Sequence, residues 1–452
     1  MFANYLFLST NVAVAFVFPT LTNLSLSVDF GAGVTLDTTG TPSMSALAGQ
    51  NSTTLNSTQA TKSKQPSIAT IQLNGKQGGT FGSGSTRVLV SDAFLNTTYN
   101  TSFSSVVVTR CSGNASYIVS NTAFKPDGSL SYYMAKATSD DQLYFDTMSQ
   151  VVDGSSAPSG VFNMLGKAGS SIDLFNYNGV IATLSMGYLR WNTRRTGNMN
   201  VSGAVYTGAR EGNQYVFAGD MYRHLEGKSM SKTEQLALVE KLNADYNIFD
   251  ASYQAYKNIN FIFHGNSICS GVNSQTRTYP AVVGQLLKSG NCWNFGDSGR
   301  STTQLNTLAS GNVDISFDPT ATKNILIFNE GINDLKNGVS ELTAYNNIKT
   351  YCQNRKTANP GLIIVVVGLT NRTDVGSPAQ YEIDRVSVNN RIAAAKSAGE
   401  TWIDVFSRVD LNSNLNPVNT TYYGADGVHP NNAGAVVWGN TVFASLLTIL
   451  TS

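Results

Sequence analysis

Near the end of the chain, an aspartate and a histidine stand three positions apart, as Asp426 and His429. Histidine is the usual proton acceptor at neutral pH, and a carboxylate can orient its ring and stabilise the charged form. The chain has three histidines in all; His224 lies in the first half, and His264 ends a strand-like run. His429 is therefore the predicted base. The alternative is a surface aspartate beside a helix-capping histidine.

A base of this kind needs a nucleophile, and a serine hydroxyl becomes one when its proton is removed during attack. In an open sheet of parallel strands, reactive groups lie on the segments that follow the carboxyl ends of strands. Three such segments follow strand-like runs, at His264–Ile268, Gly296–Arg300 and Glu330–Asp334. The first holds Ser267 and the second Ser298.

Taken in order with Asp426–Pro430, these segments resemble the signature blocks of SGNH/GDSL hydrolases, over roughly residues 258–450. The resemblance implies a flavodoxin-like, three-layer α/β fold with a parallel sheet, and a serine esterase that forms an acyl-serine intermediate. It implies that Ser267, Asp426 and His429 are catalytic. It also implies an oxyanion hole made by the backbone N–H of Ser267, the backbone N–H of Gly299 and the side-chain amide of Asn333. A glycine lets a substrate approach the backbone, and an amide donor has no proton to lose.

The literal string Gly-Asp-Ser occurs at Gly296–Ser298 and makes Ser298 a competitor for Ser267. If Ser298 were the nucleophile, a further strand ending in a glycine-containing segment would have to precede Gly331. The candidate glycine there, Gly311, follows no strand-like run. The order of the segments therefore favours Ser267.

The chain departs from the family pattern at Asn266, where an aspartate is more usual. That carboxylate is not a member of the triad. We expect the amide to change the geometry of the loop more than the catalysis, so that activity survives.

The second part of the chain, residues 251–452, alternates strand-like and helix-length segments, which predicts a parallel sheet covered by helices. The run Leu362–Val367 is apolar without alternation, as in a strand buried on both faces. The boundary is predicted between Asp250 and Lys257. The expected strands are Ile259–Phe263, Cys292–Phe295, Ile325–Phe328, Leu362–Val367 and Trp402–Phe406.

Residues 23–250 contain short apolar or alternating runs between turn-forming clusters, which predicts an all-β sandwich. The segments Asn56–Pro66 and Leu73–Lys76 resemble the opening of laminin-G/concanavalin-A-like jelly-roll modules, which implies carbohydrate binding. The expected strands include Ser104–Val108, Tyr117–Val119, Leu130–Met134, Val180–Leu184 and Tyr215–Ala218.

This part of the chain is predicted to close with a helix that begins at a capping box of Ser231 and Glu234. An apolar stripe at helical spacing follows and favours packing on the sandwich over partner binding. The stripe consists of Leu236, Val239, Leu242 and Tyr246. Trp191 beside Arg190 is either a sugar platform or a core residue of the sandwich.

Composition limits the classes of partner. The net charge is +1 and 13% of residues are charged, which favours neither a nucleic-acid surface nor a polybasic membrane patch. Residues 1–22 are apolar but lack a basic segment, so they predict a weak signal peptide, a strand or an arm rather than a transmembrane span. Abundant Ser, Thr, Asn and Gly favour a secreted or virion-surface location.

The four cysteines have no metal-ligand spacing, and the mechanism requires no metal or organic cofactor. Cys269, Cys292 and Cys352 are either disulfide partners or free buried thiols.

The predicted function is hydrolysis of an ester, most simply an O-acetyl group, on a carbohydrate. One alternative is a lipase or thioesterase of the same fold. Another is a glycan-binding adhesin of a virion or cell surface with a secondary esterase domain.

Overall fold

A computed structural model of the chain describes the backbone and side chains of most of its second half and of parts of its first half. The side chains described are those of residues 66–67, 69, 72–81, 104–110, 170–176, 183, 185, 219–225, 227, 229–249, 256–272, 278–287 and 290–451. Only the backbone is described for residues 24–29, 34–37, 43–47, 57–58, 68, 89–91, 103, 111, 116–121, 133–137, 142–146, 177, 181–182, 184, 186, 188–194, 205–207, 226 and 289.

Five parallel strands form the sheet of the second half, as predicted, in the order β18-β17-β19-β20-β21. The first strand in sequence, β17, thus lies between β18 and β19, and the chain reverses direction across the sheet between β17 and β19. A crevice forms at such a switch point, beyond the carboxyl ends of the strands. The strands are β17 (Ile259–Gly265), β18 (Ser289–Gly296), β19 (Lys323–Asn329), β20 (Leu362–Val367) and β21 (Val405–Ser407).

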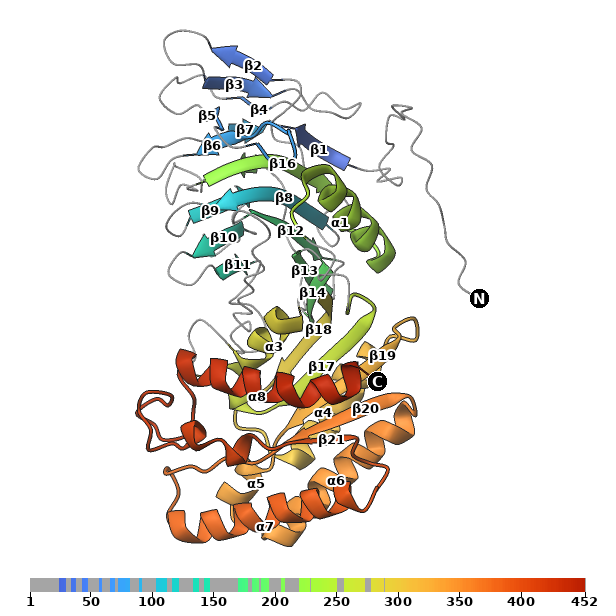
Figure 1. Cartoon of the computed structure of the whole chain (residues 1–452), viewed down its shortest axis with the longest axis vertical. Helices are drawn as coiled ribbons and strands as arrows, with labels where there is room; N and C mark the ends of the chain where they lie inside the picture. The colour runs from blue at the N-terminus through green and yellow to red at the C-terminus, as the bar shows by residue number, and fades with distance from the viewer. Residues whose placement is uncertain are drawn as a thin grey trace.

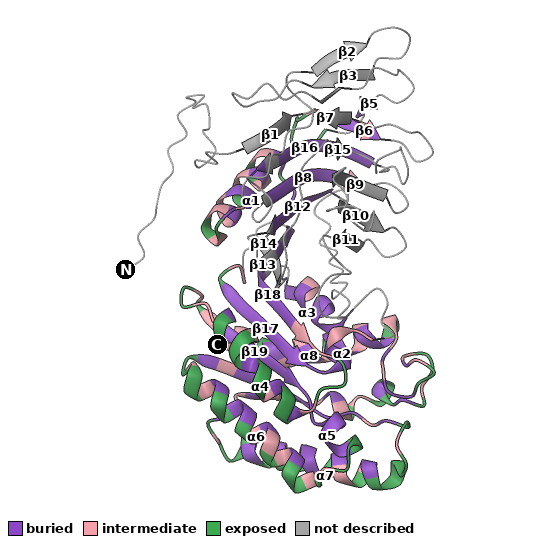
Figure 2. Cartoon of the chain, turned by 180° about the vertical axis from the view of Figure 1, so that it is seen from behind, coloured by how far each residue is buried: buried purple, intermediate pink, exposed green. Residues whose placement is uncertain are grey.

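Helices cover both faces of this sheet, so that three layers result. α3 and α8 pack against each other on one face, and α4 and α6 on the other (Figures 1 and 2). Both faces of β17, β19 and β20 are therefore buried, which explains their non-alternating apolar runs. The helices are α2 (Ser267–Ser270), α3 (Tyr279–Leu287), α4 (Thr302–Asn312), α5 (Ile332–Lys336), α6 (Glu341–Ala358), α7 (Pro378–Ser397) and α8 (Asn432–Leu450).

The last strand is shorter than predicted and begins at Val405 instead of Trp402. Asp404 causes the difference, because its carboxylate accepts the N–H of Ile364 at 2.6 Å in place of a main-chain oxygen. Trp402 lies in a turn beside it and is buried, with its ring N–H donated to Glu400 at 2.7 Å. The apolar run at this position thus reflects burial of a turn as well as a strand.

In the first half, antiparallel strands pair in the order β16-β8-β12-β13-β14. β14 then pairs in parallel with β18, so this sheet continues into the α/β sheet (Figure 1). These strands are β8 (Phe103–Cys111), β12 (Ser170–Tyr177), β13 (Ile181–Met186), β14 (Tyr188–Arg194) and β16 (Gly219–Gly227).

The remaining strands of the first half are short and antiparallel. They are β1 (Leu24–Asp29), β2 (Val34–Asp37), β3 (Ser43–Leu47), β4 (Ser57–Thr58), β5 (Ser67–Ile68), β6 (Gly79–Phe81), β7 (Leu89–Ser91), β9 (Ser116–Asn121), β10 (Tyr133–Ala137), β11 (Gln142–Asp146) and β15 (Val205–Thr207). The jelly-roll arrangement stays a prediction. The expected strand Tyr215–Ala218, the side chain of Trp191 and most of the boundary at Asp250–Lys257 lie outside the described residues.

α1 (Lys232–Tyr246) begins at the predicted capping box, in which Ser231 and Glu234 satisfy each other's backbone N–H. One member of the buried stripe differs from the prediction. Leu238 is buried while Leu236 is only half-buried, because Val239, Leu242 and Tyr246 set the buried face and Leu238 lies nearer its centre.

α8 is the helix, among the residues described, that is long and apolar enough to cross a membrane. A core helix of a folded domain passes the same test of length and composition. Here Trp438, Val442 and Leu446 are buried, and α8 packs on α3.

Cys269, Cys292 and Cys352 are buried and form no disulfide with one another, so the structure selects buried thiols over a disulfide among them. The side chain of Cys111 lies outside the described residues.

His264 is fully buried within β17, where its Nδ1 lies 2.6 Å from the hydroxyl of Tyr351. Burial, followed by the charge of Arg355, lowers the pKa of His264 to about 3. The ring is therefore neutral in the folded protein at pH values where the unfolded chain would bind a proton. This contribution to stability is present above pH ~6.5 and is lost as the pH falls toward about 3.

We expect His264→Asn to flatten the dependence of the free energy of unfolding on pH between about 6.5 and 4, because one proton taken up on unfolding disappears. Urea unfolding midpoints measured across this range test it. Tyr351→Phe is the control, since it removes the hydrogen bond but keeps the imidazole and its pH dependence. Equal slopes for His264→Asn and the wild type would contradict the prediction.

Candidate active site

The segment that carries Ser267 is bonded to both neighbouring strands where they end. The N–H of Asn266 donates to the carbonyl of Asn329 at 3.2 Å, and the N–H of Asp297 donates to the carbonyl of Gly265 at 2.8 Å. The first three sequence segments thus meet at the switch point between β17 and β19.

Ser267 is the first residue of α2, and its side chain is nearly buried. Asn266 is the N-cap, with its Oδ1 accepting the N–H of Ile268 at 2.9 Å. A backbone N–H in the first turn has no acceptor within its own helix, so the N–H of Ser267 can bind an oxygen from outside. The short helix therefore presents a hydroxyl and an N–H donor at the same residue.

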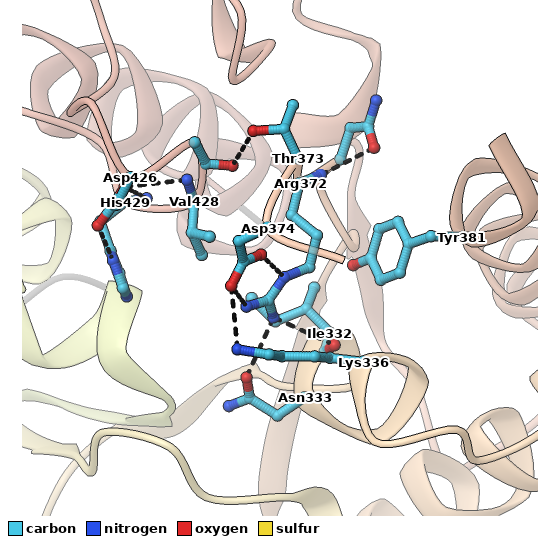
Figure 3. A network of polar contacts seen from close by, with 12 residues as sticks. Ile332, Asn333, Lys336, Arg372, Thr373, Asp374, Tyr381, Asp426, Val428 and His429 are labelled. Atoms are coloured by element: carbon cyan, nitrogen blue, oxygen red, sulfur yellow. Dashed lines mark hydrogen bonds and ion pairs between the residues drawn. The ribbon is translucent and has the colours of Figure 1, made fainter. Parts of the chain in front are cut away.

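His429 contacts both Asp426 and Ser267, and it lies 162 positions after Ser267 in the chain. Its Nε2 lies 2.7 Å from Ser267 Oγ, and its Nδ1 lies 2.6 Å from Asp426 Oδ2. Figure 3 shows the His429 ring extending from the turn that carries Asp426. A ring that donates from Nδ1 to a carboxylate leaves the lone pair of Nε2 facing the serine hydroxyl. This arrangement can remove the serine proton during attack on a carbonyl.

The Asp426 carboxylate is held by its own turn. Its Oδ1 accepts the N–H groups of Val428 and His429, each at 3.0 Å. Partial burial raises the pKa of Asp426, but the N–H and ring of His429 and the N–H of Val428 together bring it below its ordinary value. The carboxylate is therefore ionised at neutral pH and can stabilise a charged imidazole.

Thr373, on the loop after β20, fixes the turn between Asp426 and His429. Its N–H donates to the carbonyl of Gly427 at 3.0 Å. Its hydroxyl donates to the same carbonyl at 3.4 Å (Figure 3). Gly427 has a φ of +67°, and a Cβ there would lie 1.8 Å from Thr373 Oγ1. Only glycine fits this backbone conformation and this close contact.

Asn333 lies beside the segment that carries Gly299. Its Nδ2 donates to the carbonyl of Arg300 at 2.9 Å, and its Oδ1 accepts Arg372 Nη1 at 3.2 Å. The arginine thereby fixes which way the amide faces. Gly299 is exposed in a turn with a φ of +78°, and a Cβ there would meet nothing within 4 Å.

Ser298 is exposed in a turn, whereas the hydroxyl that contacts His429 belongs to Ser267. Gly296 of the same string packs against α2, since a Cβ there would lie 2.2 Å from the backbone nitrogen of Ser270. The Gly-Asp-Ser string therefore supports the turn of Ser267 through its glycine.

Two buried ionisable residues here were given no role in the sequence analysis. Glu330 accepts the N–H of Asn333 at 2.9 Å, and burial raises its pKa to about 8. Arg372 pairs with Asp374 at 2.6 Å and contacts Asn333 (Figure 3). Both follow the ends of strands, and that position is the sequence signal that could have found them.

Within the described part of the chain, no group of three or more His, Cys, Asp or Glu side chains is placed to hold a metal ion.

We expect Gly296→Ala to lower the free energy of unfolding by about 2 kcal/mol, because its methyl group overlaps the backbone of α2. Activity should fall with it, since α2 carries Ser267. Gly311→Ala is the matched control; it lies in α4 with open space around it, and should stabilise slightly. Thermal unfolding of both variants tests this. Equal stability of the two would contradict the packing argument.

Comparison with known proteins gave a family match within the second half of the chain. The model of the GDSL-like Lipase/Acylhydrolase family matches residues 263–437. No curated protein was found to be significantly similar to this chain.

Several solved structures are similar at low identity. A member of the lipolytic protein G-D-S-L family from Veillonella parvula is 18% identical, with 43% of this chain and 98% of that chain covered and a TM-score of 0.34. A family 3 carbohydrate esterase from Clostridium thermocellum is 15% identical, with coverage of 43% and 98% and a TM-score of 0.33. The lipase Lip_vut3 from a goat rumen metagenome is 14% identical, with coverage of 41% and 97% and a TM-score of 0.33.

The family match spans every segment that meets at the switch point, from the end of β17 to the turn of Asp426 and His429. The parallel five-stranded sheet and its helical layers agree with it. Residues 263–437 of this chain form a GDSL-like lipase/acylhydrolase domain.

Proposed function

We propose that this protein is a serine esterase in which Ser267 is the nucleophile, His429 the general base and Asp426 its orienting carboxylate. The observation that carries the proposal is the continuous contact from Asp426 through His429 to Ser267 Oγ, at 2.6 and 2.7 Å. These are hydrogen-bond distances for a nucleophile and its base.

In the proposed reaction, His429 Nε2 takes the Ser267 proton as Oγ attacks the ester carbonyl. The negative charge on the carbonyl oxygen is stabilised by the N–H of Ser267, the N–H of Gly299 and Nδ2 of Asn333. Such donors contribute roughly 3 kcal/mol each to the transition state. The charged His429 then protonates the leaving alcohol, and an acyl-serine remains. Water, activated by the same histidine, releases the acid and restores Ser267.

For the substrate, we propose an O-acetyl ester on a carbohydrate. Support comes from the sequence of residues 23–250, which resembles glycan-binding modules, and from the low charge of the chain. Fold resemblance alone does not determine function, so the acyl group and the alcohol need separate tests.

We expect Ser267→Ala to reduce the kcat for p-nitrophenyl acetate by at least about 10³-fold, because no other hydroxyl contacts the base in the described site. Ser298→Ala, the matched control on the neighbouring segment, should retain activity. Covalent labelling by a fluorophosphonate probe should likewise be lost only in Ser267→Ala. Loss in Ser298→Ala but not in Ser267→Ala would overturn the assignment.

We expect the full-length protein to release acetate from an O-acetylated polysaccharide and to prefer p-nitrophenyl acetate over the laurate ester. The two measurements are acetate release and the ratio of kcat/KM values for the two esters. A preference for laurate would favour a lipase or thioesterase. Binding of the polysaccharide without acetate release would favour an adhesin with a secondary esterase domain.

A further inference from the structure

Glu330 occupies a buried position between the turn of Ser267 and Asn333. Only 1% of its surface is exposed. One carboxylate oxygen, Oε1, accepts the backbone N–H of Asn333 at 2.9 Å. The other, Oε2, accepts Nδ2 of Asn266 and, at 3.5 Å, Nδ2 of Asn333. One side chain thus contacts the residue before the proposed nucleophile and a proposed oxyanion donor.

The amide of Asn266 can face in only one direction. Its Oδ1 must accept the N–H of Ile268, because this bond caps α2 at 2.9 Å. Its Nδ2 must then face the Glu330 carboxylate. A flipped amide would set a donor against the N–H of Ile268 and an acceptor against the carboxylate, and buried groups without partners are costly.

We infer that Glu330 is a positioning residue, and that Asn266 and Glu330 form a matched donor and acceptor pair that holds Ser267 in register with Asn333. The inference rests on the proposed function, because it concerns the geometry of that same site. It also gives a reason for asparagine at position 266, where the sequence pattern favoured aspartate.

The surroundings of Glu330 disfavour a second ionised carboxylate at position 266. Burial raises the pKa of Glu330 and the charge of Asp334 adds to this, while N–H donors from Gly331, Asn266 and Asn333 act in the opposite direction. An aspartate at position 266 would replace one of these donors by a second carboxyl group. Two buried carboxylates in contact cannot both ionise without a large cost.

Exchange of the two side-chain types should restore the pair. In Asn266→Asp/Glu330→Gln, the aspartate still accepts the N–H of Ile268, and the glutamine oxygen still accepts the N–H of Asn333. The hydrogen bond between the two side chains is kept with its direction reversed, from the glutamine amide to the aspartate, and only the 3.5 Å contact with Asn333 Nδ2 is lost. Glu330→Gln alone instead sets two donors against each other, and Asn266→Asp alone leaves two buried carboxyl groups that must share one proton.

The test is the kcat and KM for p-nitrophenyl acetate of the full-length single and double variants. We expect each single variant to lose kcat by about tenfold or more with little change in KM, because the displaced groups act on the transition state. The double variant should recover most of the lost kcat. A double variant no more active than Asn266→Asp, or single variants with wild-type kcat, would overturn the inference.

Asn266→Asp/Asp334→Asn is the matched control. Asp334 is a buried carboxylate in the same turn, but it accepts the N–H of Thr302 at 2.8 Å and Nδ2 of Asn347 at 3.0 Å instead of contacting Asn266. This pair removes the same charge and should recover no activity. If this control recovered as much kcat as Asn266→Asp/Glu330→Gln, net charge alone would explain the recovery. The inferred pairing of Asn266 with Glu330 would then be overturned.

Two further outcomes are distinguishable. If Asn266→Asp does not fold, Glu330→Gln alone serves as the reference, and adding Asn266→Asp to it must still raise kcat. If the wild type hydrolyses no ester, the proposed function has failed, whereas an active wild type with an unrestored double variant contradicts only the pairing of Asn266 with Glu330.

Discussion

The hydrogen bonds between the ends of β17 and β19 are the constraint on which the candidate site depends. Polar groups are concentrated there although the strands are buried, and each buried group must find a partner. Asn266 is bonded through its backbone to Asn329 and through its side chain to Glu330. These contacts leave little freedom for the turn that carries Ser267.

The loop after β20 also restricts the candidate site through hydrogen bonds of buried groups. Arg372 is buried, contacts Asn333 through one nitrogen, and is neutralised by Asp374, whose pKa is lowered to about 2 despite partial burial. The next residue along, Thr373, donates to the turn between Asp426 and His429. One short loop thus contacts both Asn333, the proposed oxyanion donor, and the turn that carries His429, the proposed base.

The site could be located from sequence because its residues follow strands in a fixed order. A parallel sheet brings the carboxyl ends of its strands to one edge, so segments far apart in sequence are expected to meet there. This reasoning favoured Ser267 over Ser298, and it is the Ser267 hydroxyl that contacts His429. Local patterns were equally informative for the capping box of α1, since capping depends on residues three positions apart.

Side chains whose partners lie on other segments were beyond such reasoning. Glu330 lies within one of the segments that the sequence analysis singled out. Its inferred positioning role, however, depends on contact with Asn266, 64 positions away. The start of β21 likewise depends on the contact between the Asp404 carboxylate and the N–H of Ile364 in β20. The pairing of β14 with β18 joins two sheets that the sequence analysis treated separately.

By itself, the sequence determined approximately where the strands of the α/β sheet lie along the chain and where α1 is capped, because each is set by periodicity or by neighbours along the chain. Tertiary structure alone decided which acceptor each buried donor meets. The reason is physical: a buried polar group takes its partner from whatever packing brings near, and that partner is specified by distance in space, not in sequence.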